Sequence, residues 1–520
     1  MTEIEAIRTL VSRGAQAEAL AALAAYLAVR QADKKAHQFA ADIHFRFGLR
    51  DKGFAHALRA FELDPADVHY GLDCAYNLLR AGRRSDALKI ADILSACTLD
   101  DANQCDTLGT IFTHAQLPAR ALPHFERACE LAGNSPQLLF NLSSAQRMLG
   151  RHEDAEASLD RVLRLAPGHG IAHLARSQLR RQTIERNHVA ELDAALAQCT
   201  SVEHQVHAGY ALAKELEDIG QYQRSFAALS AASRLQRSLV KYDAEVEVRM
   251  MQAMGHLQVT PSAREDSKSV PRGGQPIFVV GLPRSGTTLV ERIVCSIPGV
   301  GSAGEANVLG GLVWRMASGE GRPRDPVAAV LDVVRHSSAR IAADYASELG
   351  ARFDGPFVDK TPGNALFAAV IRNAFPAARI VCLRRNAMDS CYAMYKQLFS
   401  GGYPYSYELG ELADYYLEWH RMVSRWEQEL GETWLTVRYE ELVTNPEPNM
   451  RRIIKHCGLT WDDACLRFHD LGTPVTSASA GQVSRPLYTD SIGSWRRYSH
   501  ELLGLEARLR DAGIPVETNE

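Results

Sequence analysis

One short stretch of the sequence has residue types and spacing suited to binding an anion, Gly281-Leu282-Pro283-Arg284-Ser285-Gly286-Thr287-Thr288. Four apolar residues, 277–280, precede it and are typical of a buried strand, and Thr287 begins a segment with apolar residues at helical spacing. A strand, a glycine-containing loop and a helix N-terminus together direct backbone N–H groups and the helix dipole toward an anion. The stretch therefore predicts an anion-binding loop.

The two glycines of this loop have the spacing of G-x-x-x-x-G-K-[ST], but Thr287 occupies the position of the lysine. That lysine serves the β- and γ-phosphates of a nucleoside triphosphate, so we expect the loop to bind a different anion. We expect Arg284 to supply the positive charge. The hydrogen-bond donors would be the amides of Ser285, Gly286, Thr287 and Thr288 and the two threonine hydroxyls.

The first half of the chain shows a repeat of 34 residues, which must be recognised before any fold is assigned. A glycine recurs at this interval at positions 14, 48, 82 and 150, with Gln116 in the remaining position, and small residues recur at 19, 53, 87, 121 and 155. Helical patterns lie between them, and the arrangement resembles the tetratricopeptide repeat, a helix–turn–helix unit of this length. We predict an all-α solenoid over residues 1–254, although residues 170–200 match the repeat poorly.

After a segment rich in proline, serine and glycine, which predicts a linker at 255–275, the pattern changes to short apolar strands alternating with helices. The candidate strands are 277–280, 357–358, 379–383 and 434–437, and the candidate helices are 365–375, 387–398 and 412–430. This alternation predicts a three-layer α/β domain with a parallel sheet over residues 276–520. Ligands of such sheets bind at the carboxyl ends of the strands, where the loop after Gly281 would lie.

The composition restricts which classes of partner the protein is suited to bind and in which cell compartment we expect it. The net charge is −4 with 46% hydrophobic and 23% charged residues, so the whole chain is not suited to nucleic acid or to an anionic membrane. The ten cysteines are scattered without a C-x-x-C pair, which favours packed free thiols over a disulfide framework or a zinc site. With no apolar run of 18 residues and no signal-peptide pattern, we expect a cytoplasmic protein.

Further ordered blocks accompany the loop. Pro283–Leu289 resembles the 5′-phosphosulfate loop of sulfotransferases, most closely the tyrosylprotein sulfotransferases and bacterial proteins that fuse tetratricopeptide repeats to such a domain. The resemblance covers roughly residues 275–500. It implies transfer of a sulfuryl group from 3′-phosphoadenosine-5′-phosphosulfate (PAPS) to a hydroxyl or amine by in-line displacement. The nucleotide product would be 3′-phosphoadenosine-5′-phosphate, and no metal would be required.

The resemblance also implies three catalytic residues. Glu305, in Ser302-Ala303-Gly304-Glu305, lies where the tyrosylprotein enzymes have their catalytic base, and a carboxylate there can accept the proton of an attacking hydroxyl. Lys360, in Val358-Asp359-Lys360-Thr361-Pro362, matches the lysine that reaches the oxygen bridging phosphate and sulfate. Arg284 would help to stabilise the charge that develops on the leaving phosphate.

The remaining blocks imply nucleotide contacts. Arg385 matches the arginine of the 3′-phosphate motif, but Ala393 stands where the motif has a serine eight residues later, and Ser390 is the candidate substitute one turn earlier. Tyr439, in Val437-Arg438-Tyr439-Glu440, matches a tyrosine that contacts the nucleotide. Further contacts are expected from a C-terminal loop that folds over PAPS, at Gly493, Trp495 and Arg496, with Arg485 as another cation.

The acceptor and the partners stay open. The tyrosylprotein enzymes carry arginines two and six residues after the base, where this sequence has Asn307 and Gly311, so an acidic tyrosine peptide is less favoured. A protein, a glycan or a small molecule all fit the resemblance, and the tyrosine-rich stretch 400–407 is expected near the acceptor. The repeat domain would bind the acceptor or a protein partner, or only pack against the rest of the protein, and a homodimer is one state that the sequence allows.

Two other functions compete with the sulfotransferase hypothesis. A small-molecule kinase would use a similar loop, but Thr287 in place of the lysine and the lack of a second magnesium-binding motif count against it. A repeat scaffold with an inactive α/β half is favoured only by Ala393.

Overall fold

The computed structural model describes residues 2–133, 135–257, 275–319, 323–470 and 487–516, and its contacts divide the chain into two compact units. These units are Met1–Ala211 and Leu212–Glu520.

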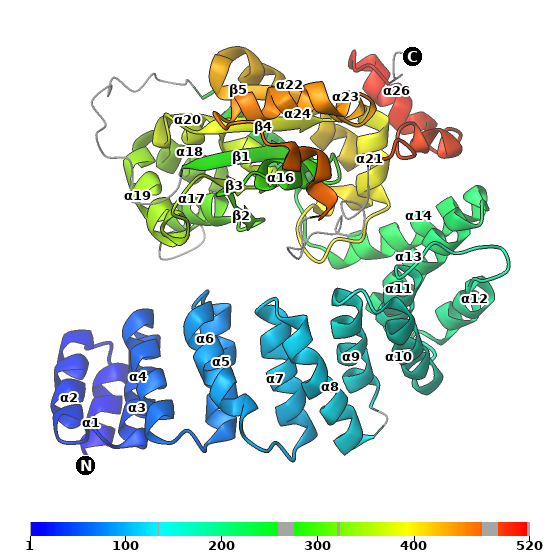
Figure 1. The fold of residues 1–520 in the computed structure, drawn as a ribbon. Helices are drawn as coiled ribbons and strands as arrows, with labels where there is room; N and C mark the ends of the chain where they lie inside the picture. The colour runs from blue at the N-terminus through cyan, green and yellow to red at the C-terminus, as the bar shows by residue number, and fades with distance from the viewer. Residues whose placement is uncertain (1, 134, 258–274, 320–322, 471–486, 517–520) are drawn as a thin grey trace. The chain divides into compact units, whose positions relative to one another are not determined.

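The N-terminal unit is a series of helical hairpins, which Figure 1 shows side by side from α1 to α10. Its helices are α1 (Glu3–Ser12), α2 (Gln16–Ala28), α3 (Lys34–Arg46), α4 (Arg50–Leu63), α5 (Val68–Arg80), α6 (Arg84–Ser95), α7 (Ala102–His114), α8 (Pro118–Ala132), α9 (Pro136–Met148), α10 (His152–Leu165), α11 (Gly170–Ser177) and α12 (Val189–Gln198), and α13 (Val202–Asp218) crosses into the second unit. The predicted helical-repeat fold is confirmed.

The 34-residue pattern has two physical causes. Glycines 14, 48, 82 and 150 have φ values of 72°, 71°, 80° and 73°, and each ends the first helix of a pair in the left-handed conformation. Gln116 takes the same conformation with φ of 61°. The second recurring position is buried between paired helices: Ala87 and Ala121 are 0% exposed, and a Cβ on Gly53 would lie 2.5 Å from the ring of Phe45. A larger side chain there would separate the two helices.

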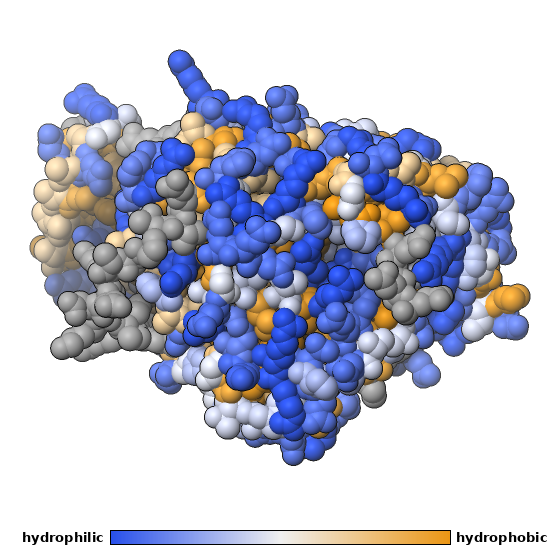
Figure 2. Space-filling model, turned by 90° about the horizontal axis from the view of Figure 1, so that it is seen from above, coloured by the Kyte–Doolittle hydropathy of each residue, from blue (hydrophilic) through white to orange (hydrophobic). Residues whose placement is uncertain are grey.

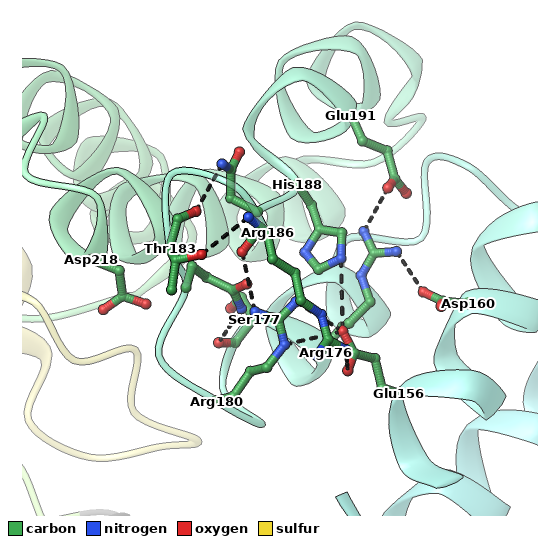
Figure 3. Close-up of polar contacts among 12 residues, drawn as sticks. Glu156, Asp160, Arg176, Ser177, Arg180, Thr183, Arg186, His188, Glu191 and Asp218 are labelled. Carbon is green, nitrogen blue, oxygen red and sulfur yellow. Dashed lines mark hydrogen bonds and ion pairs between the residues drawn. The ribbon is translucent and has the colours of Figure 1, made fainter. Parts of the chain in front are cut away.

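The poorly matching region 170–200 is held by ion pairs (Figure 3). Arg176, 4% exposed, contacts Asp160 at 2.7 Å and Glu191 at 2.9 Å. Between α11 and α12 the chain has no long helix, and Arg180 and Arg186 of this segment pair with Glu156 of α10 at 3.0 and 2.7 Å. Polar contacts thus add to the apolar packing of Ala172 and Leu179 against α10.

The C-terminal unit contains a parallel five-stranded sheet in the order β2-β3-β1-β4-β5. The strands are β1 (Pro276–Gly281), β2 (Gly301–Gly304), β3 (Phe357–Asp359), β4 (Arg379–Arg384) and β5 (Trp434–Arg438). The sequence predicted four of them. It missed β2, because Gly-Ser-Ala-Gly has neither the β-branched nor the aromatic residues that indicate a strand.

Helices cover both faces of this sheet, so the predicted three-layer α/β fold is confirmed (Figure 1). One face packs on α16 (Thr287–Cys295), α23 (Tyr439–Thr444) and α24 (Pro446–His456). On the other face, Phe278 contacts Tyr345 of α19 and Phe375.

The other helices of the unit are α14 (Tyr222–Leu239), α15 (Ala244–Gly255), α17 (Val308–Ser318), α18 (Pro326–His336), α19 (Ser338–Glu348), α20 (Ala368–Ala374), α21 (Ala387–Tyr395), α22 (Leu409–Glu429) and α26 (Leu503–Asp511). Its 3₁₀ turns are η1 (Gly350–Arg352), η2 (Pro362–Phe367), η3 (Pro404–Tyr407), η4 (Gly431–Thr433), η5 (Asp463–Asp470) and η6 (Ser494–Tyr498).

Helices α14 and α15 belong by their contacts to the C-terminal unit, although the sequence analysis assigned residues up to 254 to the repeat domain. α15 packs against α22 and α18, and the ring of Phe226 on α14 stacks on Tyr395 of α21. Side chains of both helices therefore pack on the α/β unit. Of the predicted linker, residues 258–274 lie outside the described residues.

The molecular surface in Figure 2 is mostly hydrophilic, with hydrophobic residues in separate patches. This mixture is usual for folded proteins, whose polar residues cannot cover the whole surface. Among the helices that the structure describes, none has the length and hydropathy needed to cross a membrane.

Three histidines are clustered between α3 and α4. The Nδ1 atoms of His37 and His56 are 3.0 Å apart, and the rings of His44 and His56 stack with centroids 5.0 Å apart. Burial, together with the charges that His44 and His37 would carry, lowers the pKa of His56 to about 4. The folded state therefore favours the neutral imidazole.

We expect the α3–α4 hairpin to lose stability as the pH falls. The unfolded chain binds a proton on His56 near pH 6.5, whereas the folded chain does so only near pH 4, so the stability lost between these values is about 1 kcal/mol after allowance for the half-buried ring. Amide hydrogen exchange of α3 and α4, corrected for intrinsic rates, should show this loss, and His56→Gln should reduce it. The exposed His152→Gln is the control; equal pH dependence in both variants would contradict the assignment.

Candidate active site

The predicted anion-binding loop joins the end of β1 to the first turn of α16. Ser285, Thr287 and Thr288 are 1%, 5% and 5% exposed. The N–H and the hydroxyl of Ser285 both donate to the carbonyl of Leu282, at 3.3 and 2.7 Å, so these groups hold the loop itself. The first-turn N–H groups of a helix have no acceptor within the helix, so the donors for an anion are those that begin at Gly286 and Thr287.

Two loop residues have left-handed backbone conformations. Gly286 has φ of 104°, and a Cβ at this position would lie 2.7 Å from Cδ2 of Tyr439. Arg284 has φ of 65°, which is uncommon for a residue with a side chain and typical of functional loops. The loop is thus shaped around the ring of Tyr439, one of the predicted nucleotide contacts.

Arg284 and Arg385 bring two guanidinium groups to the same place. Arg385 donates to the carbonyl of Arg284 at 3.2 Å, and its guanidinium lies 5.0 Å from the ring centroid of Tyr439. Burial, with a smaller effect from the charge of Arg385, lowers the pKa of the Arg284 guanidinium. The buried Nε of Arg385 has no hydrogen-bond partner within the described structure. Two neighbouring half-buried cations and an unsatisfied donor fit an anionic ligand.

Glu305 and Lys360 form an ion pair at the carboxyl edge of the sheet. Glu305 follows β2 and Lys360 follows β3, and pairing of these two strands brings the residues together. The Glu305 side chain is 46% exposed, whereas that of Lys360 is 2% exposed. An accessible carboxylate beside a buried ammonium can accept a proton from a substrate while the cation stabilises negative charge nearby.

Two buried carboxyl groups near this pair were missed by the sequence analysis. Glu291 of α16 lies with Oε2 3.8 Å from Nζ of Lys360, and its Oε1 accepts from Ser302 at 2.6 Å. Asp359, 0% exposed, accepts from Tyr345 at 2.8 Å and from Thr361 at 2.7 Å. Burial raises the pKa of both carboxyl groups. The signals in the sequence were a glutamate among the apolar residues of the helix after the loop and an aspartate next to Lys360.

Ser390 lies next to Arg385, as predicted, but it faces the backbone. It is 1% exposed, and its hydroxyl donates to the carbonyl of Arg385 at 3.4 Å. Ala393 is half-buried on the same helix. Whether Ser390 replaces the missing motif serine as a phosphate ligand therefore stays a prediction.

The C-terminal loop contacts the same group of residues. Arg385 donates to the carbonyl of Ser491 at 2.6 Å, and the hydroxyls of Tyr439 and Ser491 are 2.9 Å apart. Gly493 has φ of 69° and Trp495 is 6% exposed. Arg496 is exposed, and its guanidinium would lie 3.3 Å from a Cβ on Gly493. Arg485 lies outside the described residues.

The tyrosine-rich stretch forms an aromatic cluster near Glu305. The ring of Tyr403 lies 4.9 Å from that of Phe399, and Tyr405 stacks on Tyr415 at 3.5 Å. Burial, with a contribution from the charge of Glu305, raises the pKa of Tyr403 to about 12. After Glu305 in the chain, Asn307 is exposed, and a Cβ on Gly311 would have no neighbour within 4 Å.

Within the residues described, no three histidine, cysteine, aspartate or glutamate side chains are arranged to hold a metal ion. All ten cysteines are free thiols.

The family model described as "Sulfotransferase family" matches residues 276–463, the region that carries the loop, the Glu305–Lys360 pair and Arg385. Residues 276–463 are a sulfotransferase domain. The N-terminal unit that accompanies this domain is a tetratricopeptide-like helical repeat.

Three relatives each match part of this chain. Protein-tyrosine sulfotransferase 1 of Danio rerio is 25% identical over 237 residues, which are 42% of this chain and 65% of that protein. Protein-tyrosine sulfotransferase 2 of Gallus gallus is 27% identical over 239 residues, or 42% of this chain and 62% of that protein. An uncharacterized protein of Aquifex aeolicus (strain VF5) is 29% identical over 326 residues, or 60% of this chain and 42% of that protein. The chain thus spans less than two thirds of each relative.

Two solved structures are similar to parts of this chain. The sulfotransferase domain of the Synechococcus PCC 7002 olefin synthase shares 20% identity and covers 44% of this chain and 90% of its own, with a TM-score of 0.33. YrrB, a TPR protein, shares 16% identity and covers 40% of this chain and 96% of its own, with a TM-score of 0.27.

We expect Gly286→Ala to destabilise the sulfotransferase domain. The new Cβ would meet the Tyr439 ring at 2.7 Å in a left-handed backbone conformation, and the combined cost is about 2 kcal/mol in the free energy of unfolding. Urea denaturation followed by tryptophan fluorescence measures it. Gly311→Ala in α17 is the matched control, because its Cβ meets no atom within 4 Å. Equal stability of the two variants would contradict the role of Gly286.

Proposed function

We propose that this protein transfers a sulfuryl group from PAPS to a hydroxyl or amine acceptor. The observation that carries the proposal is the ion pair of Glu305 and Lys360, which lies at the same edge of the sheet as the anion-binding loop within a sulfotransferase domain. A base and a cation at this edge are the groups that sulfuryl transfer requires. No step of the proposed reaction needs a metal ion.

The first turn of α16 and the residues around Arg385 fit a ligand that carries an anionic group at each end. In the proposed complex the amides of the first turn of α16, the hydroxyls of Thr287 and Thr288, and Arg284 bind the 5′-phosphosulfate. Arg385 and Ser390 bind the 3′-phosphate. The buried and unsatisfied Nε atom of Arg385 supports this assignment, since a guanidinium can bind phosphate through two parallel hydrogen bonds. Tyr439, Gly493, Trp495 and Arg496 complete the nucleotide site.

The transfer step follows from these positions. The acceptor oxygen or nitrogen forms a bond to sulfur as the bond from sulfur to the bridging oxygen breaks, and the acceptor proton passes to the carboxylate of Glu305. The leaving phosphate gains negative charge, which Lys360 and Arg284 stabilise. Lys360 must then exchange part of its contact with Glu305 for the bridging oxygen, and the nearby carboxylate of Glu291, 3.8 Å from Nζ, supports the buried ammonium during this exchange.

The surface near Glu305 favours an uncharged, ring-containing acceptor. Asn307 and Gly311 add no positive charge, and Phe399 and Tyr403 provide aromatic rings that can stack on a phenol or a sugar. We further propose that the helical repeat binds the acceptor or a protein partner and that the protein acts in the cytoplasm.

Replacement of the base tests the mechanism. Glu305→Gln should lower turnover with radiolabelled PAPS by about 100-fold or more, because a general base contributes at least this factor. The acceptor panel should contain phenols, oligosaccharides and tyrosine peptides. The dissociation constant of 3′-phosphoadenosine-5′-phosphate should change by less than about twofold, since Glu305 contacts no nucleotide group in the proposal. Glu348→Gln, at an exposed pair with Arg315, is the control; full turnover in Glu305→Gln would exclude Glu305 as the base.

Nucleotide binding separates the proposed function from its competitors. Isothermal titration should measure the binding of 3′-phosphoadenosine-5′-phosphate to the wild-type protein in EDTA and that of ATP–Mg²⁺ in magnesium buffer. We expect the first ligand to bind at least about tenfold more tightly, because Thr287 replaces the lysine that serves a triphosphate. Tighter binding of ATP–Mg²⁺ would favour the kinase hypothesis. Lack of any nucleotide binding would favour an inactive scaffold.

A further inference from the structure

Asp389, which the proposed mechanism does not use, is buried beneath the C-terminal loop. It lies in the first turn of α21, four residues after Arg385, and is 0% exposed. Its Oδ2 accepts from the backbone N–H of Gly493 at 2.7 Å. Its Oδ1 accepts from the hydroxyl of Ser494 at 3.2 Å and from the N–H of Trp495 at 3.4 Å. A buried carboxylate with three donors from consecutive residues ties this loop to α21.

The end of the same loop is held in an aromatic box. Tyr498, the last residue of η6, is 0% exposed. Its ring centroid lies 4.6 Å from that of Tyr392, 5.6 Å from Tyr222 and 6.0 Å from Phe226. Its hydroxyl is 3.4 Å from that of Ser225. Tyr392 belongs to α21, whereas the other three residues belong to α14.

Helix α14 is fixed to the α/β core independently of the loop. Phe226 stacks on Tyr395 of α21, with centroids 5.9 Å apart. At the other end of α14, Arg237 forms a bidentate pair with Glu411 of α22, with both distances 2.7 Å. Helices α14 and α21 therefore provide a rigid support on which η6 rests.

The supported loop contacts two of the proposed nucleotide ligands. Ser491 accepts from Arg385 through its carbonyl, at 2.6 Å, and its hydroxyl is 2.9 Å from that of Tyr439. Two residues separate Ser491 from Ser494, so release of residues 493–495 would also release Ser491. Arg385 and Tyr439 would then lose the partners that orient them in the absence of nucleotide.

We propose, on the basis of the proposed function, that Asp389 and Tyr498 are positioning residues that hold loop 491–496 over the nucleotide site. Helix α14 is a required part of that support. Neither side chain needs to touch the nucleotide. The loop is pre-ordered in the protein without ligand, so the conformational entropy of ordering it is not lost on binding. Helix α14, which the repeat pattern assigned to the N-terminal domain, thus contributes to nucleotide affinity.

Asp389→Asn tests the first anchor, because the amide keeps the size of the side chain but replaces one acceptor oxygen by a donor that faces an N–H group. We expect the amides of Gly493 and Trp495 to exchange hydrogen faster in the ligand-free variant. The dissociation constant for 3′-phosphoadenosine-5′-phosphate, measured by titration, should rise about tenfold. KM for PAPS should rise by a similar factor while kcat stays within about twofold, because the catalytic groups are unchanged.

Tyr498→Ala and Tyr498→Phe form a matched pair for the second anchor. The alanine variant removes the ring from the aromatic box and should weaken nucleotide binding by about tenfold, whereas phenylalanine keeps the ring and should bind within about twofold of wild type. Glu447→Gln, which removes an exposed pair with Arg451 within α24 and leaves α14 and η6 unchanged, is the control and should leave nucleotide affinity within about twofold.

The outcomes separate this inference from the proposed function. Unchanged nucleotide affinity in folded Asp389→Asn would overturn the inference, and so would faster exchange of the loop without any loss of affinity. Failure of the wild-type protein to bind the nucleotide would instead overturn the proposed function. If Asp389→Asn does not fold, Ser494→Ala removes one of the three donors and should still raise the dissociation constant about threefold; no change there would also overturn the inference.

Discussion

Burial of the Lys360 ammonium is the constraint on which the carboxyl edge of the sheet depends. A charge that is 2% exposed requires partners, and these come from two places distant in sequence: Glu291 on α16 and Glu305 after β2. The two ion pairs of Lys360 therefore bring together the helix that follows the predicted anion-binding loop and the strand that precedes the proposed base. Asp359, fixed by Tyr345 and Thr361, sets the position of the backbone next to Lys360.

The nucleotide end of the site depends on α21 in a similar way. Arg385 lies just before this helix, Asp389 in its first turn holds the C-terminal loop, and Tyr392 in its last turns forms part of the box around Tyr498. One helix therefore connects Arg385, the proposed phosphate ligand, with the C-terminal loop and with α14. The boundary of the sulfotransferase domain at Pro276 excludes α14 and α15, but their packing shows that the compact unit includes them.

Much of the architecture could be predicted because local patterns encode it. The left-handed glycines of the repeat, the apolar strand before Gly281 and the alternating strands and helices are each properties of short segments. Strand β2 could not be predicted, because Gly301–Gly304 is a strand only by pairing with β3. The packing of α14 and α15 on α21 and α22 could not be predicted either, because their amphipathic patterns do not reveal which elements they contact.

The sequence by itself determined the fold class of each half, the anion-binding loop with a threonine in place of the lysine, and the order of the blocks containing Glu305, Lys360 and Arg385. These features are readable because each requires particular residue types at fixed local spacing. Only the tertiary structure decided that Lys360 is shared by Glu305 and Glu291, that Tyr439 packs on Gly286, and that Asp389 and α14 hold the C-terminal loop. These contacts join residues far apart in the chain, so burial and packing of the whole unit create them and no local pattern records them.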